Sequence, residues 1–182
     1  MGMIVNPYAF DLGGGVSTLF SQSELPTSTS ALDGYNIRIV LGATNLSGSG
    51  TKIRVEIQAG TTSGYDLPLS GAYIGKIASS GNAWDFDGNQ VQLLFGGTTT
   101  KTISSGEKFF SDWVTFSPDD TSSVIISFAI TDSETNSLSF TSSVGNAMYH
   151  KAASEADVGT SAPLGYSSSG AVNYCIKSIE VK

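Results

Sequence analysis

The chain has 182 residues, a length that suits one domain with a full hydrophobic core. Charged residues make up only 14% of it, against a typical level of about 25%, and 16 acidic residues outnumber nine basic ones to give a net charge of -7. This charge would repel phosphate backbones and anionic lipids, so we expect no nucleic-acid partner, and the single cysteine excludes an internal disulfide or a multi-cysteine metal site.

The first 15 residues are expected to act separately from a single domain at residues 16–182. A short apolar and aromatic run is followed by three glycines, which form a flexible joint, and Pro7 prevents the run from being a central strand. Two interpretations stay open: the run is an edge strand of the domain, or it is an anchor that binds a neighbouring protein through large, rigid side chains. The contact residues of such an anchor would be Ile4, Val5, Pro7, Tyr8 and Phe10.

Alternating apolar and polar side chains predict the first strands of the domain. Residues 35–41 and 52–57 alternate cleanly, and the second of these runs shows its charged side chains to water. Residues 65–78 alternate less regularly and are also predicted to form a strand. The apolar faces of the first two strands consist of Tyr35, Ile37, Ile39, Leu41, Ile53, Val55 and Ile57.

The stretch at residues 91–131 has the strongest strand pattern. Its apolar residues recur at every second position in three runs, which are separated by turn-forming pairs such as Gly96-Gly97 and Ser105-Gly106. We therefore expect three or four antiparallel strands, each with one apolar face. No helical stretch of the chain is long or apolar enough to cover such a face, so a second sheet must do so. The predicted fold class is all-β, a single-domain, jelly-roll-like antiparallel β-sandwich.

The C-terminal part is predicted to contain three further strands, at residues 136–143, 147–152 and 171–181. One long loop is predicted at residues 153–170. The phase of the alternation changes between Ile176 and Ile179, which predicts a β-bulge in the last strand. Cys175 lies in the same strand, and we interpret it as a small buried hydrophobe rather than a reactive thiol.

Two candidate binding features lie near residues 79–89. The segment Asp85-Phe86-Asp87-Gly88-Asn89 alternates oxygen ligands that Ca²⁺ could use, but the twelve-residue loop and distal glutamate of a calcium-binding hand are missing. We favour a turn capped by its own aspartates, and expect no metal site. Aromatic residues near the loops could instead stack on sugar rings, or simply pack against the domain. They are Trp84, Tyr149 and Tyr166, with Tyr65 as a further member.

Catalytic motifs are sparse. The Gly-Asp-Ser and Gly-x-Ser-x-Gly nucleophile motifs are absent, and a Ser-His-Asp triad would have to use His150, the only histidine. Paired carboxylates for glycoside hydrolysis stay open, because their spacing depends on the fold. We expect that the chain is not an enzyme and needs no cofactor.

Short motifs occur in a fixed order between Tyr35 and Ile130, namely Asn36-Ile37-Arg38-Ile39, Ala72-Tyr73-Ile74-Gly75, Trp84-Asp85-Phe86-Asp87-Gly88, Leu94-Phe95-Gly96-Gly97, Ile103-Ser104-Ser105-Gly106, Ser111-Asp112-Trp113-Val114 and Ile126-Ser127-Phe128. This order resembles the non-catalytic jelly-roll module that accompanies some SGNH/GDSL esterases. The resemblance implies an accessory sandwich similar to carbohydrate-binding modules. The opening Met3-Ile4-Val5-Asn6-Pro7-Tyr8 is also similar to the start of tailed-phage structural proteins.

These features together predict a non-enzymatic surface protein of a phage virion, such as a capsid decoration, a head spike or a tail fibre component. The opening residues do not read as a secretory signal, and no run of about 20 apolar residues occurs, so we expect assembly in the host cytoplasm without membrane insertion. The expected partners are other virion proteins, further copies of the chain and host surface glycans, which many copies would bind with useful avidity. The alternatives are a stand-alone carbohydrate-binding accessory module of an esterase and an esterase-like enzyme.

Overall fold

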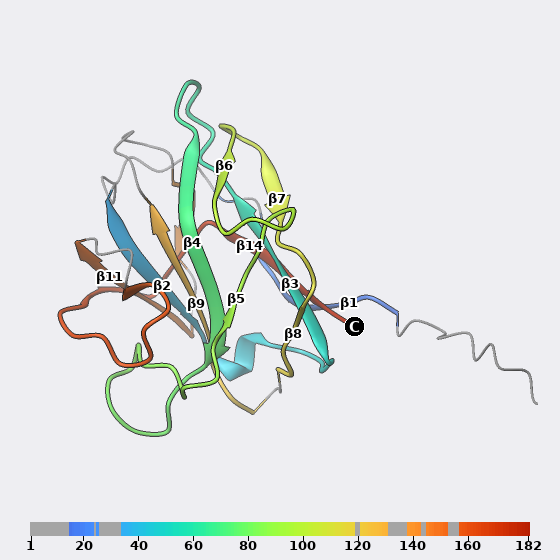
Figure 1. Cartoon of the computed structure of the whole chain (residues 1–182), viewed down its shortest axis with the longest axis vertical. Helices are drawn as coiled ribbons and strands as arrows, with labels where there is room; N and C mark the ends of the chain where they lie inside the picture. Colours follow the sequence, from blue (N-terminus) through green and yellow to red (C-terminus); the bar gives the residue numbers. More distant parts are fainter. Residues whose placement is uncertain are drawn as a thin grey trace, which may run out of the picture.

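In the computed structural model the regular elements are β-strands with one short helical turn, and most of the strands form two stacked antiparallel sheets (Figure 1). The prediction of an all-β sandwich is therefore confirmed. The anchor residues Ile4, Val5, Pro7, Tyr8 and Phe10 lie outside the described residues, so the anchor and the domain boundary behind it stay predictions. The structure describes residues 15–23, 25, 34–118, 121–130, 138–142, 145–152 and 157–182.

The larger sheet has seven strands in the order β12-β11-β2-β9-β4-β5, with β6 also paired to β4. Every strand pair in it is antiparallel. Its strands are β2 (Tyr35–Leu41), β4 (Leu67–Lys76), β5 (Val91–Gln92), β6 (Lys101–Ile103), β9 (Val124–Ile130), β11 (Asn146–Ala152) and β12 (Ser167–Gly170).

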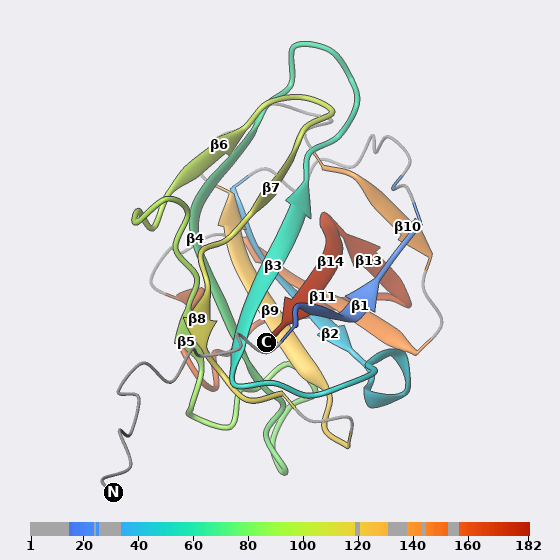
Figure 2. The ribbon, with the colours of Figure 1, turned by 90° about the vertical axis from the view of Figure 1, so that its right-hand side faces the viewer.

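The smaller sheet has five strands in the order β1-β14-β3-β7, with β8 also paired to β3 (Figure 2). A two-stranded β10-β13 ribbon and one short 3-10 helix, η1, complete the described elements. Within the described residues, no helix has the length and apolar character needed to cross a membrane. The remaining bounds are β1 (Ser17–Ser21), η1 (Ala43–Asn45), β3 (Lys52–Gln58), β7 (Lys108–Phe110), β8 (Val114–Thr115), β10 (Phe140–Ser142), β13 (Val172–Tyr174) and β14 (Ile176–Val181).

The hydrophobic core lies between the two sheets. The alternating residues of β2, β3 and β9 point into it as their spacing predicts, and nearly all of them are fully buried. Each such aliphatic or aromatic side chain contributes about 1.5–3 kcal/mol when it leaves water. The larger-sheet residues include Ile37, Ile39, Leu41, Ile126 and Phe128, and the smaller-sheet residues include Ile53, Val55, Ile57, Ile179 and Val181.

The outer face of the larger sheet differs from the prediction. We expected strands with one apolar face, yet every residue of β9 and six of the seven residues of β2 are buried. The loops at residues 77–90 and 157–166 lie against this sheet, on the side away from β3 and β14 (Figure 1). Phe86 packs there against Val40 and Ile125. The loops therefore provide a second, smaller buried layer.

The stretch at residues 91–131 also divides more finely than expected. Its strands are β5 to β9, and they do not form one continuous meander. β5 and β6 pair with β4 of the larger sheet, whereas β7 and β8 pair with β3 of the smaller one. The predicted loop at residues 153–170 was wrong at its end, because residues 167–170 form β12.

Cys175 separates β13 from β14. It is fully buried, and its backbone φ of 59° lies in the left-handed region that side chains rarely adopt. The register of β14 against β3 shifts between Ile176 and Ser178, which confirms the predicted bulge. Burial raises the pKa of the Cys175 thiol to about 12, which confirms that it is a buried hydrophobe rather than a reactive thiolate.

This raised pKa predicts a specific loss of stability at alkaline pH. The thiol ionises near pH 9 when the chain is unfolded but only near pH 12 when it is folded, so its contribution is complete below pH 9 and declines as the pH rises towards 12. Between pH 8 and pH 10, we expect the free energy of unfolding to fall by about 1.5 kcal/mol more in the wild type than in Cys175→Ala. Urea denaturation of both proteins at the two pH values measures the difference, and equal losses would contradict the buried thiol.

Candidate functional site

Arg38 lies at the centre of the second buried layer. It projects from the outer face of β2 and is fully buried. Its guanidinium carbon lies 4.4 Å from the centre of the Phe86 ring and 5.3 Å from that of Tyr166. A cation between two aromatic faces is stabilised by their ring electrons, and more strongly when water is excluded. The sequence contained no sign that this arginine is buried rather than exposed.

The guanidinium also binds backbone carbonyls of both outer loops. Nη1 donates to the carbonyl of Trp84 at 2.5 Å, and Nη2 donates to that of Asp157 at 3.2 Å. Further hydrogen bonds reach the carbonyls of Thr160 and Ser161. One side chain therefore holds the loops at residues 77–90 and 157–166 to the sheet.

The charge balance around Arg38 follows from this burial. Loss of water around the guanidinium lowers the pKa of Arg38, while the neighbouring Tyr166, Asp85 and Asp157 act in the opposite direction. Burial likewise raises the pKa of Tyr166, and the positive charge of Arg38 opposes that shift. The layer is thus built around a buried charge that depends on its carbonyl and ring contacts.

The two outer loops also bind each other directly. The backbone N–H of Phe86 donates to the carbonyl of Ser161 at 2.8 Å, and Gln90 Nε2 donates to the carbonyl of Gly159 at 2.6 Å. Gly75 of β4 is required beneath them, because a Cβ there would lie 2.6 Å from Cδ1 of Phe86. The loop at residues 77–90 is consequently fixed on both sides.

Three of the aromatic residues predicted to bind sugars come together in this layer. The Trp84 ring lies 5.2 Å from Tyr149 and 6.0 Å from Tyr166, and its Nε1 donates to the carbonyl of Pro163 at 3.0 Å. Tyr166 is only 7% exposed. These contacts favour packing, and sugar stacking by the cluster stays a prediction. Tyr65 is separate, since it precedes β4 whereas the Trp84 loop follows that strand.

The aspartates of the Asp85–Asn89 segment bind within their own loop. Asp85 Oδ2 accepts the backbone N–H of Asn82 at 2.8 Å, and Asp87 Oδ1 accepts that of Asn89 at 2.9 Å. These bonds confirm the turn capped by its own side chains. Within the described ranges, no group of three acidic, histidine or cysteine residues could hold a metal ion.

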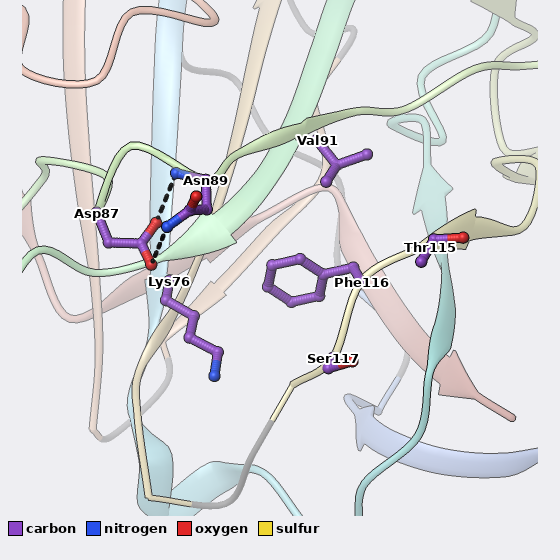
Figure 3. A pocket seen from close by; sticks show the side chains of 7 residues that line it. All are labelled: Lys76, Asp87, Asn89, Val91, Thr115, Phe116 and Ser117. Atoms are coloured by element: carbon purple, nitrogen blue, oxygen red, sulfur yellow. Dashed lines mark hydrogen bonds between the residues drawn. The ribbon is translucent and has the colours of Figure 1, made fainter.

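The tip of this loop forms one wall of a groove of about 370 Å³ (Figure 3). The groove opens where β4 and β5 of the larger sheet meet the segment that follows β8. The ring of Phe116, 8% exposed, points across it towards Lys76 and the Asp87–Asn89 turn. Its lining consists of Lys76, Asp87, Asn89, Val91, Thr115, Phe116 and Ser117.

The sequence indicated only part of this groove. The pattern of oxygen ligands picks out Asp87 and Asn89, and the apolar alternation predicts that Phe116 is a core residue, which the structure confirms. Neither pattern predicts that Phe116 and Lys76 also line a groove. No local pattern links positions 40 residues apart that meet only after the sheets stack. A smaller hollow of about 190 Å³ lies between β6 and β7, but there Lys101 Nζ already covers the Phe109 ring at 3.9 Å.

His150 has one of the contacts that an esterase-like enzyme would need. Ser169 Oγ lies 2.9 Å from His150 Nδ1, across the β11-β12 pair. A triad also requires a carboxylate on the second ring nitrogen and donors for the oxyanion. Among the residues that the structure describes, no carboxylate bonds to the His150 ring, and neither residue lines the groove. The expectation that the chain is not an enzyme stays a prediction.

Comparison with known proteins does not assign a family. No model of a protein family matches the chain, and a search of curated proteins finds no similar sequence. The likenesses to esterase accessory modules and to tailed-phage proteins therefore rest on the short motifs alone.

The buried position of Arg38 predicts a large effect of its removal. Arg38→Ala leaves buried carbonyls of both loops without their donor, so we expect a loss of about 3–5 kcal/mol in the free energy of unfolding and faster proteolysis within residues 77–90. Arg54→Ala is the matched control. Arg54 also lies over two rings, Phe110 and Trp113, but its side chain is 30% exposed, so its loss should cost about 1 kcal/mol. Equal losses in the two variants would contradict the role of Arg38.

Proposed function

We propose that the chain is a non-enzymatic surface protein of a tailed-phage virion that adheres to host surface glycans. It would serve as a capsid decoration, a head spike or a tail fibre component. The observation that carries the adhesive part of this proposal is the groove beside Phe116, whose lining combines apolar surface with hydroxyl, amide and carboxylate groups.

This combination suits a sugar ring. A pyranose has apolar C–H faces and a rim of hydroxyl groups, each of which both donates and accepts hydrogen bonds. The half-buried Val91 and the small exposed part of Phe116 offer apolar surface, while Asp87, Asn89 and Ser117 offer acceptors and donors. Binding sites of this type have a mostly apolar lining and a few polar groups that fix the ligand's orientation.

The size and openness of the groove favour weak binding of a single sugar unit. Millimolar dissociation constants correspond to only about 4 kcal/mol, which a few hydrogen bonds and one ring contact can supply. Display of many copies on one particle would raise the avidity by orders of magnitude without new contacts. A virion surface provides this arrangement.

Association between copies has support in the sheet edges. β12, with the sequence Ser-Ser-Ser-Gly, is an edge strand of the larger sheet, and all four of its residues are exposed. It carries neither the charges nor the prolines that usually protect an edge from pairing with another strand. Further copies of this chain, together with other virion proteins, are the partners that we propose.

The second candidate is a stand-alone carbohydrate-binding accessory module of an esterase. The jelly-roll-like sandwich favours it equally, and the same groove would bind the sugar. The two candidates differ in the partner. Capsid and tail genes beside this coding region would favour the virion protein, whereas a hydrolase gene would favour the accessory module.

Glycan adhesion is tested by multivalent display of the protein. We expect beads coated with the native chain to bind host cells or purified host surface polysaccharide, and to be released by soluble polysaccharide. Beads coated with heat-denatured chain are the control. Failure of the native chain to bind any surface glycan at high density would remove the adhesive function.

The anchor is tested by deletion of residues 1–10. We expect the shortened chain to keep the circular dichroism of the sandwich, because β1 begins only at Ser17. Its copy number in purified particles should fall at least about tenfold, since the aromatic side chains that would supply the contact are removed. Replacement of Tyr8 and Phe10 by alanine in the full chain should give the same loss. Normal incorporation of the shortened chain would show that the anchor lies elsewhere.

A further inference from the structure

We infer that the groove selects neutral pyranosides over acidic ones, and that Asp87 and Asn89 determine this specificity. The inference rests on the glycan adhesion proposed above. It adds the class of sugar and the residues that recognise it.

The Asp87–Asn89 turn can still form hydrogen bonds to a ligand. Asp87 Oδ1 accepts the Asn89 backbone N–H at 2.9 Å, and Oδ2 lies 3.5 Å from Asn89 Nδ2. Each carboxylate oxygen has two acceptor positions, so each keeps one for a ligand hydroxyl, and the Asn89 amide keeps a donor and its own acceptor. Two adjacent sugar hydroxyls can therefore bind the pair together, one donating to Asp87 and the other accepting from Asn89.

The opposite wall supplies the apolar contact. The ring of Phe116 points towards the Asp87–Asn89 turn but packs in the core and is only 8% exposed, so most of the apolar contact comes from the half-buried Val91 beside it (Figure 3). A ligand that spans the groove must present hydroxyl groups on one side and C–H groups on the other. Pyranosides have both, whereas a phosphate or a carboxylate alone has no apolar face.

Charge selects among the pyranosides. The recognising turn contains an exposed carboxylate, and the chain as a whole has a net charge of -7. Lys76 also lines the groove, but its ammonium end points away from the Asp87–Asn89 turn (Figure 3). A uronic acid bound to the turn through its hydroxyls would therefore bring its carboxylate near a like charge, which disfavours binding by roughly tenfold at the distances of adjacent groups near a surface.

The wall is in place before a ligand arrives. The backbone N–H of Asp87 donates to the carbonyl of Lys76 at 3.0 Å, and the N–H of Phe86 just before it is bound to Ser161. The buried Arg38 fixes the same loop through Trp84. A prearranged turn loses little conformational entropy on binding, so even a few contacts suffice for measurable affinity.

The test uses NMR titration of the full chain with methyl glycosides. The neutral probes are the methyl pyranosides of glucose, galactose and mannose, and the acidic probes are the methyl glycosides of glucuronic and galacturonic acid. Asp87→Asn keeps an oxygen that can accept the Asn89 N–H but removes the charge, and Asn89→Ala removes the amide. Asp66→Asn is the matched control, because Asp66 also accepts a backbone N–H, that of Ser105 at 3.0 Å, and lies outside the groove lining.

We expect at least one neutral glycoside to bind with a millimolar dissociation constant and to shift the amide signals of residues 87–91. Asp87→Asn and Asn89→Ala should weaken it about tenfold or more, and Asp66→Asn should leave it unchanged. Asp87→Asn should also reduce the discrimination against the uronic acids. Amide signals of the three variants that match the wild type away from the substituted positions and the groove would show that the variants are folded.

The outcomes separate this inference from the proposed function. Uronic acids that bind as tightly as the neutral sugars, or neutral glycosides that bind without loss in Asp87→Asn and Asn89→Ala, would overturn the inference and leave glycan adhesion intact. Polysaccharide binding by coated beads with no response to any neutral glycoside would also overturn it. Absence of binding in both experiments would overturn the proposed function as well.

Discussion

The contact of the Arg38 guanidinium with the carbonyls of two loops determines how the outer side of the larger sheet is built. A charged side chain on a sheet normally points to water. Here it is buried, so the backbone of both loops must supply acceptors and two aromatic rings must cover its faces. The loops that meet this demand also bury the outer side chains of β2 and β9. The sandwich consequently has one large core between its sheets and a smaller one outside them.

This arrangement assigns different roles to the aromatic residues. The Trp84 ring lies against those of Tyr149 and Tyr166, and the Tyr166 ring also lies against the guanidinium of Arg38. Phe116 instead belongs to the core between the sheets and also lines the groove, opposite a turn whose position the arginine layer sets through Trp84 and Phe86. The stability of the outer layer and the shape of the groove are thus linked, because the same loop takes part in both.

Spacing alone predicted the inner core well. The alternation in β2, β3 and β9 places Ile39, Val55 and Ile126 between the sheets. A covered face of a sheet requires apolar side chains at every second position of each strand. Burial of the opposite face was not predictable, since Asn36 and Arg38 look like solvent-facing residues unless the loops that cover them are known. The groove was only half predictable for a similar reason. Asp87 and Asn89 stand out in sequence as oxygen ligands, but the alternation that places Phe116 in the core gives no sign that this residue also lines a groove.

The order of the smaller sheet has a consequence for how the protein is made. β14 is the last described strand in chain order and lies between β1 and β3, so that Ser17 is paired with Val181. β1 and β3 therefore have no partner along those edges until β14 has been synthesised. Closure of the smaller sheet depends on contacts between distant parts of the chain, and such contacts form slowly. Until β14 pairs with both strands, the apolar inner face of this sheet is incomplete and its partner face in the larger sheet is uncovered.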